Sequence, residues 1–146
     1  MKALFAVLTV LFCLSAEARD FAFSCTGYTR DNMQVTVSGA MDFRGGRLVP
    51  TTPLNVNRQI FNISGPTPEV EDPMVDFDFP RAQVRLRNSP EMFNVVARWG
   101  QAEVIIRHEQ FSTQQSYIKV YLYPGVDHEF NYGSCEIQDD FFSDDF

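Results

Sequence analysis

Polar and apolar residues alternate along most of the chain beyond residue 18. In "YIKVYLYPG", for example, Ile118, Val120 and Leu122 point to one side of an extended chain, and three tyrosines and Lys119 point to the other. A period of two is typical of a β-strand with one buried face, and no later stretch keeps a helical period for three turns. The pattern therefore predicts an all-β domain.

Turn residues divide this alternation into short segments. Eight prolines and eight glycines lie mostly between the alternating runs. Strands are expected near residues 20–28, 33–43, 47–49, 54–63, 74–79, 81–87, 93–99, 102–110, 116–123 and 129–137. This spacing predicts a single antiparallel β-sandwich or small β-barrel of about eight to ten strands. The sequence leaves the choice between sandwich and barrel open.

One hairpin can be placed in register. The two-residue loop at 100–101 begins with glycine and suits a type II′ turn. This turn pairs Trp99 with Ala102 and Arg98 with Glu103 across the two strands. One face of the hairpin is then wholly apolar, and it consists of Val95, Ala97, Trp99, Ala102, Val104 and Ile106.

The segment 1–18, "MKALFAVLTVLFCLSAEA", has the organisation of a signal peptide. Lys2 precedes an apolar run, and the small residues Ala16 and Ala18 suit a signal peptidase. The run is shorter than the roughly 20 residues that cross a membrane as a helix, and no comparable run follows. We expect a removed signal peptide (1–18), an all-β domain (19–138) and a disordered acidic, aromatic tail (139–146). The expected location is secreted or periplasmic, with no transmembrane segment after processing.

The number of cysteines is consistent with export from the cytoplasm. Of the three in the chain, Cys13 leaves with the signal peptide, so Cys25 and Cys135 remain. An even pair in an oxidising compartment predicts one disulfide. Because bridged Cα atoms lie within about 7 Å of each other, the first and last strands should be neighbours.

The cysteine motifs also carry a resemblance. With "FSC" in the first strand and "GSCEI" in the last, the chain resembles periplasmic lysozyme inhibitors of the small-barrel type. The resemblance covers the two cysteines and the number of strands, and the internal loop motif of those inhibitors is not recognisable here. It implies a role in binding and assigns no residue.

Charge narrows the range of partners. The formal net charge is −7, and four of the negative charges lie in the tail. An acidic chain argues against nucleic acid as a partner. A protein or glycan outside the cytoplasm remains as the expected partner, and the protein is expected to be a monomer.

Signatures of catalysis and of cofactor binding are absent from the sequence. It contains no G-x-S-x-G, no H-E-x-x-H and no glycine-rich phosphate or dinucleotide loop. We therefore assign no catalytic, cofactor-binding or metal residues, and no cofactor is expected. His108 and His128 lie next to carboxylates and could join a metal site, but the preferred interpretation makes both ordinary polar positions.

Carboxylates at residues 69–78 offer a second catalytic possibility. Paired carboxylates could serve glycoside hydrolysis, or the cluster could form a loose calcium loop. The candidates are Glu69, Glu71, Asp72, Asp76 and Asp78. We prefer a solvated acidic loop and strand face, in which Asp76 and Asp78 lie beside the strand at 81–87 and pair with its arginines.

Two sets of outward-facing side chains are the candidate binding residues. The first set is Tyr117, Lys119, Tyr121 and Tyr123, and the second set is Arg81, Arg85 and Arg87. The tyrosines could also form a second core face or an aromatic ladder, and these structural interpretations together are preferred.

Exposed tyrosine and arginine together with the missing catalytic motifs favour a binding or inhibitory module for a protein or glycan partner. The alternatives are a structural envelope-associated protein with no discrete ligand and a carboxylate-dependent hydrolase.

Overall fold

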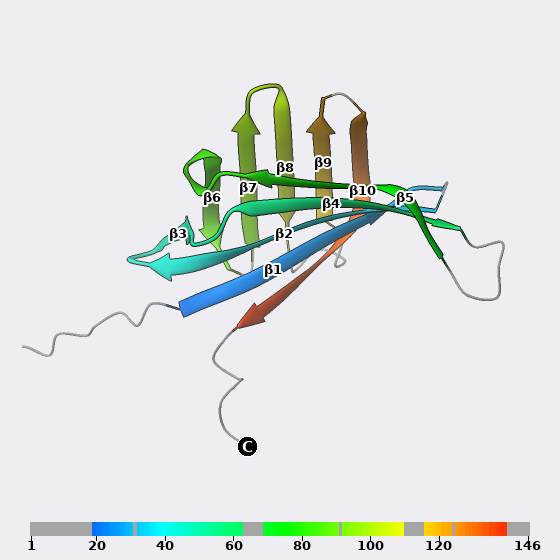
Figure 1. The fold of residues 1–146 in the computed structure, drawn as a ribbon. Helices are drawn as coiled ribbons and strands as arrows, with labels where there is room; N and C mark the ends of the chain where they lie inside the picture. The colour runs from blue at the N-terminus through cyan, green and yellow to red at the C-terminus, as the bar shows by residue number, and fades with distance from the viewer. Residues whose placement is uncertain are drawn as a thin grey trace, which may run out of the picture.

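The computed structural model describes residues 19–30, 32–62, 69–90, 92–109, 116–123 and 125–139. The predicted signal peptide and the tail from residue 140 onward lie outside these ranges. Within them the chain forms ten strands, one short 3₁₀ helix and no α-helix (Figure 1). The elements are β1 (Arg19–Tyr28), β2 (Met33–Arg44), β3 (Arg47–Pro50), β4 (Leu54–Asn62), β5 (Glu69–Phe79), η1 (Arg81–Gln83), β6 (Val84–Ser89), β7 (Met92–Trp99), β8 (Ala102–His108), β9 (Ser116–Leu122) and β10 (Val126–Asp139).

All strands belong to one antiparallel sheet that nearly closes into a barrel. The strand order is β5-β4-β2-β1-β10-β9-β8-β7-β6, and β3 pairs with β2 beside this path. The two ends of the path approach each other, because the rings of Phe77 in β5 and Trp99 in β7 lie 5.9 Å apart. The structure thus confirms the all-β prediction and resolves the choice left open by the sequence in favour of a nearly closed barrel.

Strand β10 connects two halves of the sheet that cross each other. Its first part pairs with β9 and its last part pairs with β1. The pairing with β9 is irregular between Phe130 and Gly133, where β10 turns from the upright strands β6–β9 to the strands that cross in front of them (Figure 1). A Cβ atom at Gly133 would lie 2.4 Å from the Ile118 side chain. Glycine at 133 therefore permits the close approach of β10 and β9 at the bend.

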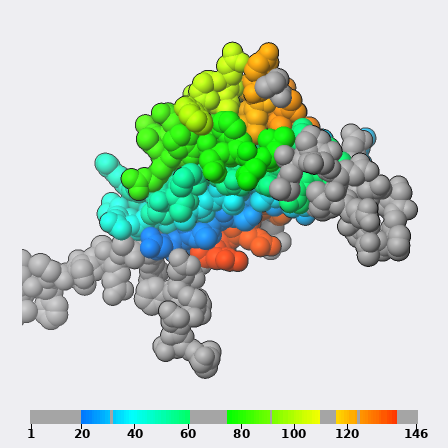
Figure 2. Space-filling view, in the orientation of Figure 1, coloured from blue at the N-terminus to red at the C-terminus, as the bar shows by residue number. Residues whose placement is uncertain are grey.

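The core fills the space between the two halves. Figure 2 shows the N-terminal strands, in blue and cyan, below the yellow-green and orange strands of the second half. Phe23 from β1 and Phe93 from β7 meet in the core with ring centroids 5.2 Å apart. Ile118, Val120 and Leu122 of β9 are buried, so the aliphatic side of this strand belongs to the core, as its alternating pattern predicted.

The predicted hairpin is present in the predicted register. Strands β7 and β8 pair Trp99 with Ala102 and Arg98 with Glu103, and the loop residue Gly100 has a φ of +61°. The apolar face is buried except for Trp99, which is 50% exposed and packs on Phe77.

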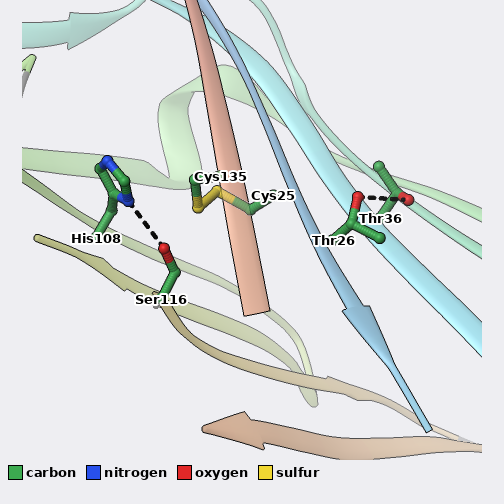
Figure 3. The surroundings of a disulfide bond; sticks show 6 residues. All are labelled: Cys25, Thr26, Thr36, His108, Ser116 and Cys135. Atoms are coloured by element: carbon green, nitrogen blue, oxygen red, sulfur yellow. Dashed lines mark hydrogen bonds between the residues drawn. A yellow bond between two sulfur atoms is a disulfide. The ribbon is translucent and has the colours of Figure 1, made fainter. Parts of the chain in front are cut away.

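The predicted disulfide is also present. Cys25 and Cys135 are cross-strand partners in β1 and β10, and their Cα atoms are 4.0 Å apart (Figure 3). The first and last strands are therefore neighbours, as the cysteine pattern predicted.

Two predictions about the arginine segment are wrong. Residues 81–83 form a 3₁₀ turn, in which the Gln83 amide donates to the Pro80 carbonyl over 2.8 Å, so the strand begins only at Val84. Strands β5 and β6 lie at opposite ends of the strand order, so Asp76 and Asp78 do not lie beside the arginine strand. The physical reason is the crossover: the chain leaves one edge of the sheet and joins the other, and residues 80–83 make that connection.

The two aspartates pair elsewhere. The Asn55 side-chain amide in β4 donates to both Asp76 and Asp78 on the neighbouring strand β5. The side chains of the other three acidic candidates, Glu69, Glu71 and Asp72, lie outside the described part of the structure.

Within the described ranges no helix is long and apolar enough to cross a membrane.

Candidate functional site

Five of the seven candidate binding residues, drawn from both sets, meet on one face of the sheet. Arg85 and Arg87 point outward from β6, and Tyr117, Lys119 and Tyr121 point outward from β9, three strands away. The outward residues of β7 and β8 lie between them. We call this surface the arginine–tyrosine face, and its members are Arg85, Arg87, Asn94, Val96, Arg98, Glu103, Ile105, Arg107, Tyr117, Lys119 and Tyr121.

The strand register arranges these side chains in rows. One row runs from Arg85 through Val96 and Ile105 to Lys119. The next row toward the β7–β8 turn contains Arg98, Glu103 and Tyr121, and the row on the other side contains Arg87, Asn94, Arg107 and Tyr117. The outward positions of β6–β9 thus combine five basic side chains with one acidic side chain, Glu103.

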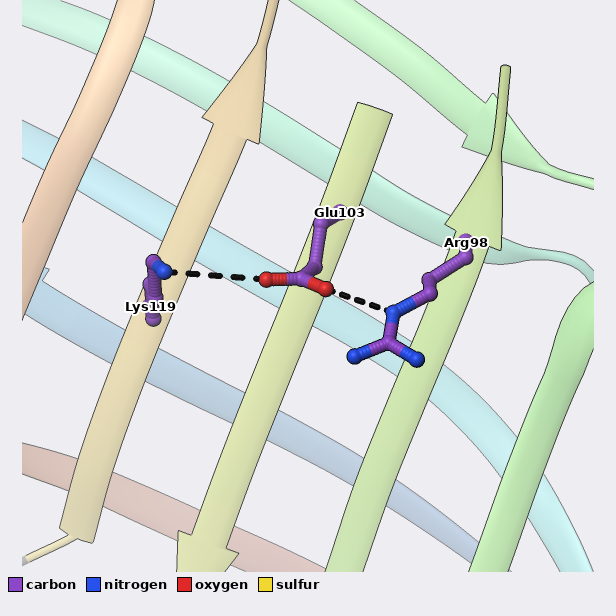
Figure 4. Close-up of polar contacts among 3 residues, drawn as sticks. All are labelled: Arg98, Glu103 and Lys119. Carbon is purple, nitrogen blue, oxygen red and sulfur yellow. Dashed lines mark hydrogen bonds and ion pairs between the residues drawn. The ribbon is translucent and has the colours of Figure 1, made fainter. Parts of the chain in front are cut away.

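Glu103 is neutralised by its neighbours on both sides. One carboxylate oxygen accepts from Arg98 Nε over 2.6 Å, and the other lies 3.6 Å from Lys119 Nζ (Figure 4). The Arg98 hydrogen bond and the two positive charges hold the pKa of Glu103 below its usual range, although partial burial acts in the opposite direction. The single carboxylate of these strands is therefore already occupied by cations.

The other three arginines of the arginine–tyrosine face, Arg85, Arg87 and Arg107, have no carboxylate partner among the described residues. Arg85 Nη1 donates to the Ala82 and Val84 carbonyls over 2.7 and 3.2 Å. The guanidinium of Arg107 lies 5.5 Å from the centre of the Tyr117 ring, which is a cation–π distance.

These arginines border a hollow of about 500 Å³. Its lining is Arg85, Arg87, Asn94, Val96, Arg98, Ile105, Ile106 and Arg107. The hollow therefore has a positive rim and an aliphatic floor.

Tyr117 and Tyr121 are half-buried on the outer side of β9. Burial, followed by the charge and hydrogen bond of Glu129 on β10, raises the pKa of Tyr117. Figure 4 shows the neighbouring Lys119 and Glu103 on the side of the sheet opposite the crossing strands. No described element forms a second layer over this face, which does not favour the interpretation of the tyrosines as a second core face.

Two candidate binding residues, Tyr123 and Arg81, lie outside the arginine–tyrosine face. Tyr123 follows the last residue of β9 and is 68% exposed in the turn toward β10. Arg81 lies on η1 and lines a second hollow of about 480 Å³, which also contains Asp42 and shares Arg85 with the first hollow.

The burial of Asp42 is unexpected from the sequence. The alternation of Met41 and Phe43 places Asp42 on an outward side, yet its side chain is only 2% exposed and forms an ion pair with Arg44. Its Oδ1 atom has no hydrogen-bond partner among the described residues and no accessible surface. Without access, that oxygen cannot contact a ligand in the hollow.

Sequence reasoning missed the middle of the face. Arg98 was recognised only as one half of a hairpin pair with Glu103, and Arg107 was not singled out. The signal was present, because the outward side of the predicted hairpin carries both arginines. The sequence could not show that β6 and β9 flank this hairpin.

The histidines lie apart from the face. His108 is buried at the end of β8, where its Nδ1 lies 2.8 Å from Ser116 Oγ (Figure 3). Its ring also packs on Phe93, with centroids 5.1 Å apart. His108 is therefore a core residue and not the ordinary polar position expected from the sequence. The described residues contain no cluster of three or more potential metal ligands.

Burial makes the stability of the protein sensitive to mild acid. It lowers the pKa of His108 below the unfolded value of about 6.5. The unfolded chain then binds more protons than the folded chain below that pH, so the free energy of unfolding should fall as the pH drops from 7.5 to 5. Urea denaturation at a series of pH values should show this fall and a shallower one in His108→Gln.

The pKa of His128 is lowered as well, first by burial and then by the charge of Arg58. Part of the slope should therefore persist in His108→Gln and become smaller again when His128 is also replaced. An unchanged slope in the double variant would contradict the assignment to histidine.

Comparison with known proteins gives no relative. No protein family, curated protein or solved structure matches this chain.

Proposed function

We propose that this chain is an exported binding or inhibitory module that recognises a protein or glycan through the arginine–tyrosine face. The observation that carries the proposal is the convergence of two separate sequence segments. Arg85 and Arg87 from β6 and Tyr117, Lys119 and Tyr121 from β9 are brought to one side of one sheet.

The composition of the face supports recognition. Arginine and tyrosine are enriched at the energetically important positions of protein interfaces, because they combine a large contact area with hydrogen-bonding groups. Rigid aromatic side chains also lose little conformational entropy on binding. Arg98 is 68% exposed and Arg85, Arg87 and Arg107 are exposed, so a partner can reach them.

The disulfide supports the proposed location. A bridge between Cys25 and Cys135 forms and persists in oxidising compartments and is rare in the cytosol. A secreted or periplasmic module also suits the signal peptide expected at residues 1–18.

Tyr121→Ser tests the function. The side chain is half-buried on the outer side of β9, so we expect this change to lower the free energy of unfolding by only about 1 kcal/mol. The variant should lose a stoichiometric partner that the wild-type protein captures from the extracytoplasmic fraction of its source. Denaturation and quantified pull-downs measure the two effects separately.

Tyr28→Ser is the matched control, because Tyr28 is a 68% exposed tyrosine on β1, outside the face. It should retain the partner. Equal capture by both variants would contradict the role of the face. A loss of stability of about 3 kcal/mol or more in Tyr121→Ser would instead identify this tyrosine as core.

A further inference from the structure

The hollow on the arginine–tyrosine face indicates the chemistry of its occupant. Four guanidinium groups border it, and none of the side chains that line it is acidic. Guanidinium groups bind carboxylates through paired hydrogen bonds and also stack on aromatic rings. An anionic occupant with aromatic groups therefore suits this rim.

The floor of the hollow distinguishes a peptide from a sulfated or carboxylated glycan. Val96 and Ile105 are half-buried neighbours in one row, and they offer an apolar surface between the charged groups. A glycan polyanion would satisfy the arginines and leave these aliphatic side chains without an apolar contact. A peptide that combines aspartate or glutamate with phenylalanine would satisfy both.

The chain itself contains such a peptide. Residues 140–146 follow the end of β10, read "DFFSDDF" and carry three aspartates and three phenylalanines. We propose that this segment of one molecule binds the arginine-rich hollow of a second copy. The inference rests on the proposed binding role of the face and names the partner of that face.

The segment is too short to lie along the hollow of its own molecule. From Asp139 the route runs back along β10 to Glu129, about 30 Å of strand, and then across β9 to β8, about 10 Å more. The seven residues 140–146 span about 25 Å at full extension. Figure 1 shows the far end of β10 on the opposite side of the molecule from the β7–β8 turn. The same segment of a second molecule can approach the hollow from solvent, so its reach from β10 does not prevent this contact.

The proposed contact between two molecules is heterologous. The segment and the hollow are different surfaces, so each molecule would offer one of each to its neighbours. Such heterologous contacts give open head-to-tail chains, unless the rotation between copies closes a ring. Association should weaken as salt rises, because opposite charges that are exposed to solvent are screened.

The probe is a fluorescein-labelled synthetic peptide of residues 140–146, titrated with the oxidised wild-type protein and followed by fluorescence anisotropy. We expect saturable binding that weakens at least tenfold in Arg87→Glu. The matched control is Arg47→Glu, which reverses an exposed charge on β3 outside the face and should leave the affinity unchanged. A peptide with asparagine in place of its three aspartates should not bind.

Sedimentation velocity supplies a second measurement on the intact protein. Concentration-dependent association is expected for the wild-type protein and Arg47→Glu and should be lost in Arg87→Glu. If Arg87→Glu fails to fold, Arg107→Gln replaces it, with at least a threefold loss of peptide affinity expected. Absence of peptide binding, or equal binding to all variants, overturns the inference.

Heparin separates this inference from the proposed function. If Arg87-dependent binding is seen with heparin and not with the peptide, the occupant is a glycan and self-recognition is wrong, while the face keeps its binding role. The same conclusion follows if a foreign protein is captured through Tyr121 and the peptide does not compete with it. If binding of the peptide, of heparin and of any captured protein is unchanged by substitutions on the arginine–tyrosine face, the proposed function fails as well.

Discussion

Phe93→Ala is expected to lower the free energy of unfolding by about 3–5 kcal/mol. Phe93 is fully buried and lies where the two crossing halves of the sheet meet, with its ring 5.2 Å from that of Phe23 and 5.1 Å from that of His108. Truncation removes these contacts and leaves a cavity that the paired strands on either side cannot close. Urea denaturation followed by tryptophan fluorescence measures the loss.

Met92→Ala is the control for this change. Met92 is the neighbouring residue in β7 and is 43% exposed, so its truncation should change the free energy of unfolding by about 0.5 kcal/mol or less. Similar small losses in both variants would show that the halves of the sheet do not depend on Phe93 for their packing.

Removing the disulfide is expected to cost about 2–5 kcal/mol. Cys25 and Cys135 are 110 residues apart in sequence, so the bridge closes a long loop in the unfolded chain. The wild-type protein reduced under denaturing conditions and the double variant Cys25→Ala, Cys135→Ala should each show a cost in this range. Urea denaturation with and without reductant compares them.

The double variant also supplies the control, because reductant should not change its stability. A thiol assay on the unreduced, denatured protein should find neither Cys25 nor Cys135 free. Two free thiols would contradict the bridge, and a disulfide-linked dimer would contradict the pairing within one chain.

Local patterns in the sequence predicted the local structure well. The alternation placed nearly every strand, and the glycine at 100 fixed the β7–β8 register, because both features depend on neighbouring residues alone. The cysteine pair supplied one long-range constraint, and it correctly made β1 and β10 neighbours.

The sequence did not predict the order of the strands in the sheet. Asp76 and Asp78 were expected to pair with the arginines of residues 81–87, because opposite charges on neighbouring strands stabilise their register. In the structure a crossover at residues 80–83 separates them, and the alternation on either side gives no sign of it. The same limit hid the candidate site, because β6 and β9 share a face only through the intervening hairpin of β7 and β8.

The central strand pair of the sheet has a consequence for the timing of folding. Strands β1 and β10 lie beside each other in the middle of the strand order, although they are the first and last strands of the described chain. Their pairing requires closure of a loop that includes every other strand, and closing a loop of this length costs conformational entropy before the contact is gained. A growing chain can therefore pair the strands within each half as they emerge, but the two halves can join through β1 and β10 only once residue 139 is available.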